Sequence, residues 1–272
     1  MESFAEGIHD LPAERYDAAD GVSATMLNIL AASTPLHLRC WLNGQTEREE
    51  TEALRFGIIA HYAILQGEVY KDRFHVSPEG MKFNTKAGIA WKADHEDKPI
   101  VKYDDAMHLI GMVESISRHP FARRLLSTGK PEQSLFVYDD LGNLRKSRLD
   151  SLTLGTTLPD IKTVMSASDD YFKRLISRLR YHVRAAFYLD NCNLLNIDKQ
   201  QFFFIAVEKL PPYAVRCLQL NGDCITWGRK CYQADLQTYR NCVESDEWPG
   251  YTNSYEEIAL PDYEMKWILE LI

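Results

Sequence analysis

The stretch TLPDIKTVMSAS, residues 157–168, decides which fold this sequence can form and which chemistry it can carry. Asp160 and Lys162 stand one residue apart in it, ahead of a run rich in threonine and serine. The β-branched and apolar residues of 156–164 predict a β-strand. Because strand side chains alternate between the two faces of a sheet, Asp160 and Lys162 are expected on the same face. The stretch therefore predicts either a solvated strand edge or the metal-and-lysine corner of an active site.

Two further strands are predicted directly before this stretch, and they carry a second carboxylate. Residues 134–140 and 144–154 are strand-like and are joined by Leu-Gly-Asn, a favourable hairpin turn. Asp150 lies near the end of the second strand, ten residues before Asp160. Neighbouring strands would thus bring two carboxylates and one ammonium group into a single cluster.

Helical periodicity dominates the rest of the chain. The predicted helices, with their expected ends, are 21–43 with Ser23 as N-cap, 51–67 with Gly67 as C-cap, 101–127 interrupted near Pro120, 168–189, and 222–244. Residues 70–100 are mixed and polar, and predict loop with short helices. Two more strands are expected within 201–220, where the run from Phe202 to Phe204 is interpreted as a buried strand rather than a base-stacking platform.

This order of elements predicts a mixed α/β (α+β) fold, with a central mixed sheet flanked by helices. No repeat and no low-complexity linker divides the chain, so 1–272 is interpreted as a single domain. Its expected parts are a mostly helical region over 1–130, the catalytic sheet and helices over 131–250, and a C-terminal tail over 251–272.

Composition indicates a soluble globular protein, with 45% hydrophobic and 26% charged residues. No stretch approaches the roughly eighteen uncharged apolar residues of a transmembrane helix. The acidic N-terminus lacks the basic and then apolar layout of a secretory signal. The six cysteines include no CxxC pair, which favours reduced thiols in a cytoplasmic protein over a disulfide framework or a zinc site.

The charge is unevenly distributed along the chain. The net charge is −8, but residues 145–184 hold nine Lys/Arg against four Asp, so this window is +5 and the remainder is −13. A basic segment inside an acidic protein is compatible with a focused phosphate-binding surface. An ordinary solvated basic helix would give the same pattern.

The aspartates and the lysine are suited to metal-dependent phosphodiester hydrolysis. Carboxylate oxygens are hard ligands for Mg²⁺ or Mn²⁺, and phosphate oxygens and waters complete the coordination. A lysine beside the ion orients or deprotonates an attacking water, or stabilises charge in the transition state. Two aspartates followed by a lysine arise often by chance, so the spacing alone is a weak signal.

His61 adds a third donor type to this set. It lies in the apolar run GIIAHYAIL, where a histidine is more often a satisfied core residue than a metal ligand. A neutral imidazole can nevertheless bind a divalent ion beside two aspartates. A metalloprotease is not indicated, because His61 lacks the second histidine and the glutamate of HExxH.

Six segments, taken together, resemble one nuclease family. They are FGIIAHYAILQG (56–67), KSRLD (146–150), LPDIKT (158–163), RYHVRAAFYLD (180–190), FFFIAVEKLPPYAV (202–215) and EWPGY (247–251). In order and spacing they resemble the RecE-type (exonuclease VIII) branch of the PD-(D/E)xK nucleases, and the resemblance extends from about Arg15 to Tyr251. Several motifs in the right order are far more specific than any one of them.

The resemblance implies a role for individual residues. It implies metal ligation by His61, Asp150, Asp160 and the backbone carbonyl of Ile161, with Lys162 as the catalytic lysine and Tyr188 as the tyrosine of a QxxxY motif. The sequence departs from the family at Arg184, where glutamine is usual and positions the nucleophilic water or the scissile phosphate. An arginine cannot accept a hydrogen bond, although it can bind phosphate.

The resemblance also implies an activity. The expected protein is a Mg²⁺-dependent 5′→3′ exonuclease, with Mn²⁺ as a substitute ion, that acts on linear double-stranded DNA ends and leaves 3′ single-stranded tails for single-strand-annealing recombination. A ring-shaped trimer or tetramer, an annealing protein as partner, no membrane, and a phage or prophage origin in the bacterial cytoplasm are implied as well. The candidate contacts to the DNA backbone are Arg148, Lys173, Arg174, Arg178 and Arg180.

Two alternatives stay open. One is a related endonuclease or single-strand-specific nuclease. The other is a DNA-binding module whose catalysis is impaired by Arg184. For the basic residues, the alternative to DNA contact is a solvated helix face.

Overall fold

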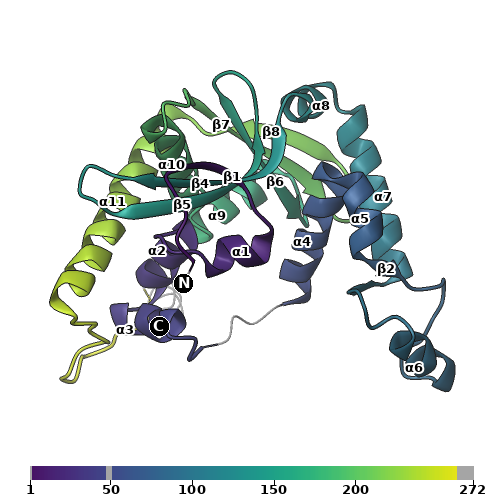
Figure 1. The fold of residues 1–272 in the computed structure, drawn as a ribbon, viewed down its shortest axis with the longest axis horizontal. Helices are drawn as coiled ribbons and strands as arrows, with labels where there is room; N and C mark the ends of the chain where they lie inside the picture. Colours follow the sequence, from purple (N-terminus) through teal and green to yellow (C-terminus); the bar gives the residue numbers. More distant parts are fainter. Residues whose placement is uncertain (1, 47–50, 262–272) are drawn as a thin grey trace, which may run out of the picture.

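The computed structural model describes residues 2–46 and 51–261 (Figure 1). The helices are α1 (Ala13–Ala18), α2 (Ala24–Ala32), α3 (Pro35–Leu42), α4 (Glu52–Leu65), α5 (Gly67–Arg73), α6 (Lys86–Ala93), α7 (Tyr103–Arg118), α8 (Pro120–Ser127), α9 (Asp169–Arg178), α10 (Tyr181–Leu194) and α11 (Gly222–Ser245). The strands are β1 (Gly7–Asp10), β2 (His75–Val76), β3 (Ile100–Val101), β4 (Lys130–Tyr138), β5 (Leu144–Leu152), β6 (Thr157–Val164), β7 (Gln201–Glu208) and β8 (Val215–Gln219).

Two three-stranded ladders meet at β5 and β6. The first ladder has the order β1-β4-β5 and is antiparallel throughout. The second has the order β6-β7-β8, in which β6 runs parallel to β7 and β7 antiparallel to β8. β5 and β6 lie next to each other without a backbone ladder, and the Ile161 N–H donates instead to Oδ2 of Asp150 at 2.6 Å. The seam between the ladders is therefore joined through a candidate site residue.

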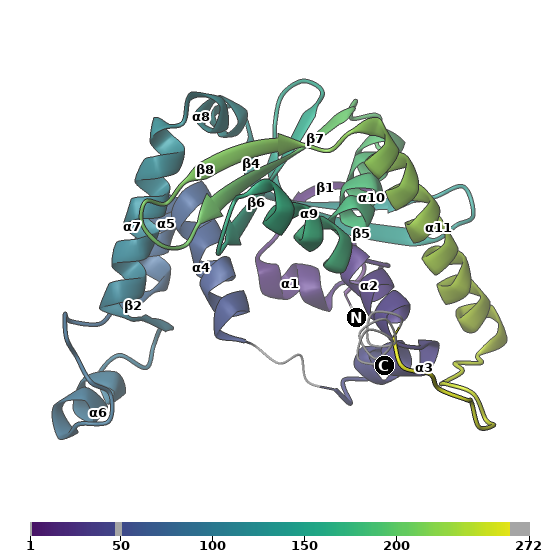
Figure 2. The same ribbon diagram turned by 180° about the vertical axis from the view of Figure 1, so that it is seen from behind.

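Helices cover both faces of the second ladder (Figure 2). On one face, α4, α7 and α8 pack against Ile161, Ile205 and Val207 in a buried cluster. On the other face, α9 and α10 pack against Phe202 and Phe204. In Figure 1, α2, α3 and α11 gather at one end and α4, α5 and α7 at the other, so that the elements form an arch. The fold is thus mixed α/β, as the sequence predicts.

The strands and the last helix agree closely with their predictions. β4, β5 and β6 correspond to the three predicted strands before residue 165, and β7, β8 and α11 to the elements predicted after residue 200. Phe202, Phe203 and Phe204 are buried, which confirms the core interpretation of this run. Ser23 is the N-cap of α2, because its side chain accepts from the Met26 N–H.

Three predicted helix boundaries are wrong. The helix expected over 21–43 is broken, because Thr34 is extended and Pro35 can only begin a new helix. The helix expected over 168–189 is broken at Arg180, which adopts a left-handed conformation with φ of 52°. Gly67 is not a C-cap, since α4 ends at Leu65 and Gly67 begins α5. The short strands β1, β2 and β3 are absent from the prediction.

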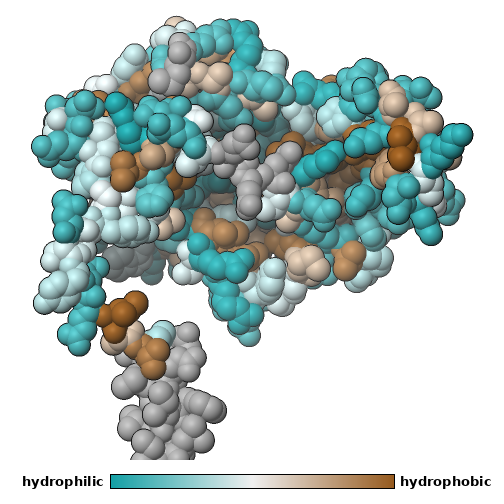
Figure 3. Space-filling model, turned by 90° about the horizontal axis from the view of Figure 1, so that it is seen from below, coloured by the Kyte–Doolittle hydropathy of each residue, from teal (hydrophilic) through white to brown (hydrophobic). Residues whose placement is uncertain are grey.

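The surface of the arch is predominantly polar. Figure 3 views the molecule from below, and hydrophilic residues there surround separate hydrophobic patches. Among the described helices, none has the length and hydrophobicity needed to cross a membrane. Residues 252–261 of the predicted C-terminal tail are exposed and form neither helix nor strand, and 262–272 lie outside the described residues.

Candidate active site

β6 places Asp160 and Lys162 on one face, directed toward α10. Both side chains are buried, and Nζ of Lys162 donates to Oδ2 of Asp160. The same ammonium group lies 3.2 Å from the Ile161 carbonyl oxygen and 5.1 Å from the centroid of the Tyr181 ring. The predicted same-face arrangement is confirmed, and it is an enclosed acid–lysine pair rather than a solvated strand edge.

Asp150 and His61 complete the predicted set from neighbouring elements. Oδ1 of Asp150 on β5 lies 3.5 Å from Nδ1 of His61 on α4. His61 Nε2 lies 3.1 Å from the carbonyl oxygen of Ile161. Because a carbonyl oxygen only accepts, Nε2 carries the proton in this contact. The fold therefore gathers every predicted metal ligand and the predicted catalytic lysine, from residues more than one hundred positions apart in sequence.

The structure adds Glu132, which the sequence analysis did not single out. Its side chain is buried, with Oε1 at 3.9 Å from Nδ1 of His61 and Oε2 at 2.8 Å from Nη1 of Arg148. Its backbone is left-handed, with φ of 54°, at the one point where the β4–β5 pairing skips a position. The hairpin register could have identified this residue, because a hairpin that pairs Tyr138 with Leu144 places Glu132 opposite Asp150.

The carboxylates of this cluster repel each other. Burial, followed by repulsion from Asp150, raises the pKa of Glu132 to about 6. Burial also raises the pKa of Asp160, and Asp150 adds to the shift, although Lys162 opposes it. Crowded, desolvated carboxylates of this kind are typical of sites that bind a cation or perform acid–base chemistry.

α10 contributes Arg184 and Tyr188, one turn apart on the face toward the cluster. Burial opposes the charge on Arg184, but Tyr188, Asp160 and Asp150 outweigh it and raise its pKa. Nε of Arg184 is buried without a hydrogen-bond partner. Burial raises the pKa of Tyr188 to about 12, so its hydroxyl stays protonated at neutral pH. Arg184 thus faces the two aspartates as a permanent cation.

The five candidate DNA-contact residues occupy two kinds of environment. Arg148 is ion-paired with Glu132 inside the cluster, and Nη2 of Arg180 lies 2.5 Å from Oδ2 of Asp235 on α11. Arg180 is therefore engaged in holding the α9–α10 junction against α11. The remaining candidates are exposed on α9; they are Lys173, Arg174 and Arg178, called the α9 basic residues below. Their contact with DNA stays a prediction.

The basic segment 145–184 is largely an interior feature. Of its nine Lys/Arg residues, only the α9 basic residues are exposed. Arg145 and Lys146 are buried in β5, and Nζ of Lys146 donates to backbone carbonyl oxygens of Tyr16, Asp17 and Ala19. Most basic side chains of this segment therefore contact interior carboxylate and carbonyl groups. Only a minority of them contribute positive charge to the protein surface.

The donor set fits a hard divalent cation in its chemistry. The carboxylate oxygens and the backbone carbonyl oxygen are the ligand types that Mg²⁺ and Mn²⁺ take in proteins, and the imidazole adds a nitrogen donor. In the described parts of the chain, however, no three His, Cys, Asp or Glu side chains already converge as a finished metal site. The reason is visible locally, because Lys162 occupies Asp160 and Ile161 N–H occupies Oδ2 of Asp150. An ion at Oδ2 of Asp160 would compete with Lys162 for that oxygen.

Sequence comparison extends this arrangement to a family. Residues 23–260 match the PDDEXK-like domain of unknown function (DUF3799). The chain belongs to this family. The match covers the helix with His61, the strands with Asp150, Asp160 and Lys162, and α10 with Arg184. No significant match was found among curated proteins.

One solved structure shares the fold of this chain. A candidate exonuclease from Eubacterium rectale superposes with a TM-score of 0.67 at 14% sequence identity, over 94% of this chain and 98% of that chain. The two proteins share a fold along almost their whole length. An alkaline exonuclease from Laribacter hongkongensis also matches, with 14% identity over 58% of this chain and 73% of that chain, but its TM-score is only 0.31.

Proposed function

We propose that this protein is a divalent-metal-dependent nuclease that hydrolyses phosphodiester bonds in DNA. One observation carries the proposal: His61, Asp150, Asp160, the Ile161 carbonyl and Lys162 come from two strands and a helix into one buried cluster. Membership of a PDDEXK-like family and the fold shared with a candidate exonuclease support it.

Each side chain has a task that follows from its chemistry. His61, Asp150, Asp160 and the Ile161 carbonyl would hold the ion, Mg²⁺ by preference and Mn²⁺ as a substitute. The bound ion supplies charge neutralisation at phosphate and a lowered pKa for water. Lys162, once released from Asp160, is placed to orient or deprotonate the attacking water or to stabilise charge on the phosphate. Tyr188 is a neutral hydrogen-bond donor beside the cluster.

Within this class, we propose a 5′→3′ exonuclease on linear double-stranded DNA ends. The support is the ordered set of six segments that resembles the RecE-type branch, including LPDIKT and RYHVRAAFYLD. The 3′ tails so produced would serve single-strand-annealing recombination, with a ring-shaped trimer or tetramer around the duplex, an annealing protein as partner, and the bacterial cytoplasm as the site of action. Phosphate contacts would make binding salt-sensitive and largely independent of sequence.

The test is digestion of linear and closed circular duplex DNA with Mg²⁺, for the unmodified protein and for Lys162→Ala. We expect linear DNA alone to be degraded, with no degradation by the variant. Polarity is tested separately with duplexes labelled at the 5′ or the 3′ end. Cleavage of circular DNA, or of single strands alone, would favour the endonuclease or single-strand-specific alternative instead.

One observation favours a second candidate, a DNA-binding module with impaired catalysis. Arg184 places a cation next to Asp160 and Asp150, where the resembled family carries a neutral glutamine. If the protein binds DNA but cleaves neither form with Mg²⁺ or Mn²⁺, this candidate replaces the nuclease. Recovery of cleavage in Arg184→Gln would then identify the arginine as the cause.

A further inference from the structure

Lys162 has aromatic as well as polar partners in the cluster. Its Nζ atom lies over the ring of Tyr181, 5.1 Å from the centroid, and 6.0 Å from the centroid of the Phe204 ring. Lys162 is only 9% exposed, so water competes little with these rings for the ammonium group. A cation over the face of an aromatic ring is attracted electrostatically, and more strongly where both are desolvated. Because about 6 Å is the limit of such contacts, Tyr181 is the stronger of the two partners.

The polar partners of Lys162 are the groups that the proposed nuclease function assigns to an ion. Nζ donates to Oδ2 of Asp160 and lies 3.2 Å from the Ile161 carbonyl oxygen, and both residues are predicted metal ligands. The face of an aromatic ring, in contrast, is not a ligand for a hard cation, which takes oxygen donors. The ring of Tyr181 is therefore the partner that the ammonium group would keep when an ion occupies those oxygens.

The Tyr181 ring is held in place by groups other than Lys162. Tyr181 is the first residue of α10, and the residue before it, Arg180, is left-handed and ion-paired with Asp235 of α11. The ring packs against Phe172 of α9 and Phe204 of β7, with centroid separations of 6.4 Å and 5.5 Å. The face that Lys162 contacts is thus fixed by the junction of α9 and α10 and by the sheet.

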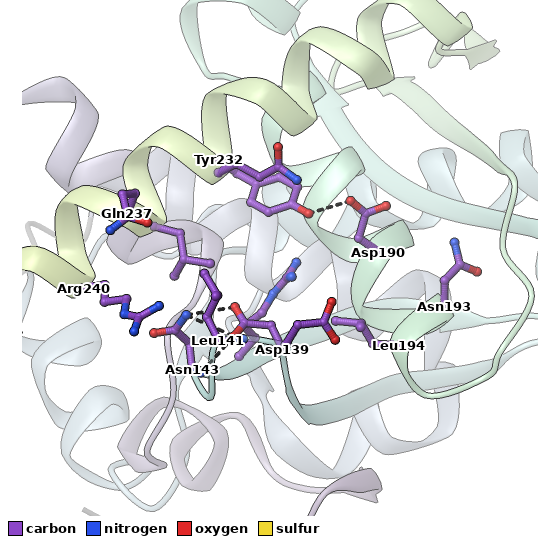
Figure 4. Close-up of a pocket in the computed structure, with 13 residues that line it drawn as sticks. Asp139, Leu141, Asn143, Asp190, Asn193, Leu194, Tyr232, Gln237 and Arg240 are labelled. Atoms are coloured by element: carbon purple, nitrogen blue, oxygen red, sulfur yellow. Dashed lines mark hydrogen bonds between the residues drawn. The ribbon is translucent and has the colours of Figure 1, made fainter.

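Tyr181 contacts the cluster through its ring rather than through its hydroxyl. Within the described residues, the hydroxyl of Tyr181 forms no hydrogen bond. Tyr232 on α11 shows the other arrangement, because its hydroxyl donates to Asp190 at 2.6 Å (Figure 4). The ring of Tyr232 also lies near a buried cation, 4.9 Å from Cζ of Arg145. Replacement by phenylalanine would therefore remove a hydrogen bond at Tyr232 but would leave the cation contact at Tyr181.

We propose that Tyr181 is a positioning residue for the proposed cleavage, and that its ring holds the Lys162 ammonium group beside the candidate metal ligands. Asp160 is then available to an ion, while the lysine stays near enough to act on the attacking water or the phosphate. Small displacements of a catalytic group reduce rates strongly, so this placement matters. The inference rests on the nuclease function proposed above, and it adds a role for Tyr181, which lies in the segment RYHVRAAFYLD but is not among the predicted site residues.

The contact itself is tested without metal or DNA, by a double-mutant cycle in urea unfolding with EDTA. The variants are Tyr181→Leu, Lys162→Met and the double variant. We expect Tyr181→Leu to lower the folding equilibrium constant about 2- to 30-fold more when Lys162 is present than when it is methionine, which is the range for a cation over an aromatic ring. Phe172→Leu is the matched control, because it removes a neighbouring ring that Lys162 does not lie over, and its effect should be the same in both backgrounds. Equal effects of Tyr181→Leu in the two backgrounds would overturn the proposal.

The consequence for the reaction is tested by the rate of DNA cleavage in Mg²⁺. Tyr181→Leu should lower kcat roughly tenfold or more, because the lysine is displaced, and should leave the Kd for DNA within about threefold. Tyr181→Phe keeps the ring face and should restore kcat to within about threefold of the unmodified protein, as should Phe172→Leu. A loss of kcat in Tyr181→Phe as large as in Tyr181→Leu would overturn the proposal, because the hydroxyl would then be the functional group.

Failure of this inference and failure of the nuclease function give different results. If the unmodified protein cleaves DNA and Tyr181→Leu cleaves it equally fast, the nuclease function stands and the role of Tyr181 is wrong. If the unmodified protein cleaves no DNA, the nuclease function is wrong, and the positioning role falls with it even where the cycle in EDTA detects the contact. If Lys162→Met fails to fold, the cleavage rates of Tyr181→Leu and Tyr181→Phe decide alone.

Discussion

The side chain of Asp150 is expected to have two roles. It stabilises the fold as a hydrogen-bond acceptor, and it takes part in the proposed DNA cleavage through its negative charge. Its Oδ2 atom accepts the Ile161 N–H at 2.6 Å and joins β5 to β6, where no backbone ladder forms. Its negative charge, in contrast, faces His61 and raises the pKa of Glu132. Asp150→Asn removes the charge and keeps an acceptor, whereas Asp150→Ala removes both.

The magnitudes follow from these two contacts. A buried hydrogen bond to a charged acceptor is worth about 1.5–3 kcal/mol, and a bond to a neutral amide about 1 kcal/mol. The pKa of Glu132 rises from 4.5 to about 6 in the folded protein. At pH 7.5, which is above both pKa values, this rise corresponds to about 2 kcal/mol of destabilisation, because the charged form is less favourable in the folded state. Burial is its largest cause, so repulsion from Asp150 contributes less to this rise than burial does. We expect the free energy of unfolding of Asp150→Asn to lie within ~1 kcal/mol of that of the unmodified protein. That of Asp150→Ala should be about 1–3 kcal/mol lower than that of the unmodified protein.

The assay is urea unfolding in EDTA at pH 7.5, combined with DNA cleavage in Mg²⁺. Both variants are uncharged at residue 150, so the relief of repulsion cancels between them and their difference isolates the acceptor. Both should lose cleavage, because both remove a carboxylate charge that would hold the divalent cation. Equal stability of the two variants would refute the role of Asp150 at the β5–β6 seam. Full cleavage by Asp150→Asn would refute its role as a metal ligand.

Four further outcomes are expected. Mn²⁺ should raise the melting temperature of the unmodified protein but not of Asp160→Asn, measured by differential scanning calorimetry. Changing the α9 basic residues to glutamine should weaken DNA binding and reduce its salt dependence by about three phosphate contacts, measured by fluorescence anisotropy at several salt concentrations. Gly228→Ala should cost about 1–3 kcal/mol in urea unfolding, because a Cβ there would overlap the His182 carbonyl, while Gly222→Ala, with open space around it, should be nearly neutral. Arg184→Gln should bind Mn²⁺ at least tenfold more tightly, or about 1.4 kcal/mol, in calorimetric titration, because a competing cation is removed.

The sequence was sufficient for the five strands from β4 to β8 and for His61, Asp150, Asp160 and Lys162. Alternation specifies which strand residues share a face, so the pairing of Asp160 with Lys162 could be predicted directly. The hairpin turn placed Asp150 on the neighbouring strand. Helix ends were harder, because the break at Arg180 coincides with a tertiary ion pair to Asp235 of α11 that no local pattern contains.

The distribution of surface charge was the property that the sequence predicted least well. A window of excess positive charge predicts a basic surface only if its side chains point outward, and most of those in 145–184 point inward. Within the site, Arg148, Lys162 and Arg184 offset the carboxylates of Glu132, Asp150 and Asp160, three charges against three.

That balance explains why these charged side chains can lie close together, and why a bound ion would alter their contacts. A divalent cation at the carboxylates would compete with Lys162 for Asp160, and would release the ammonium group toward a phosphate. The contact that stabilises the Asp160 carboxylate is thus the same contact with which an ion at Oδ2 would compete. Arg184 cannot lose its proton, so its positive charge always opposes a second cation at the carboxylates. It therefore influences how readily an ion replaces Lys162 at Asp160.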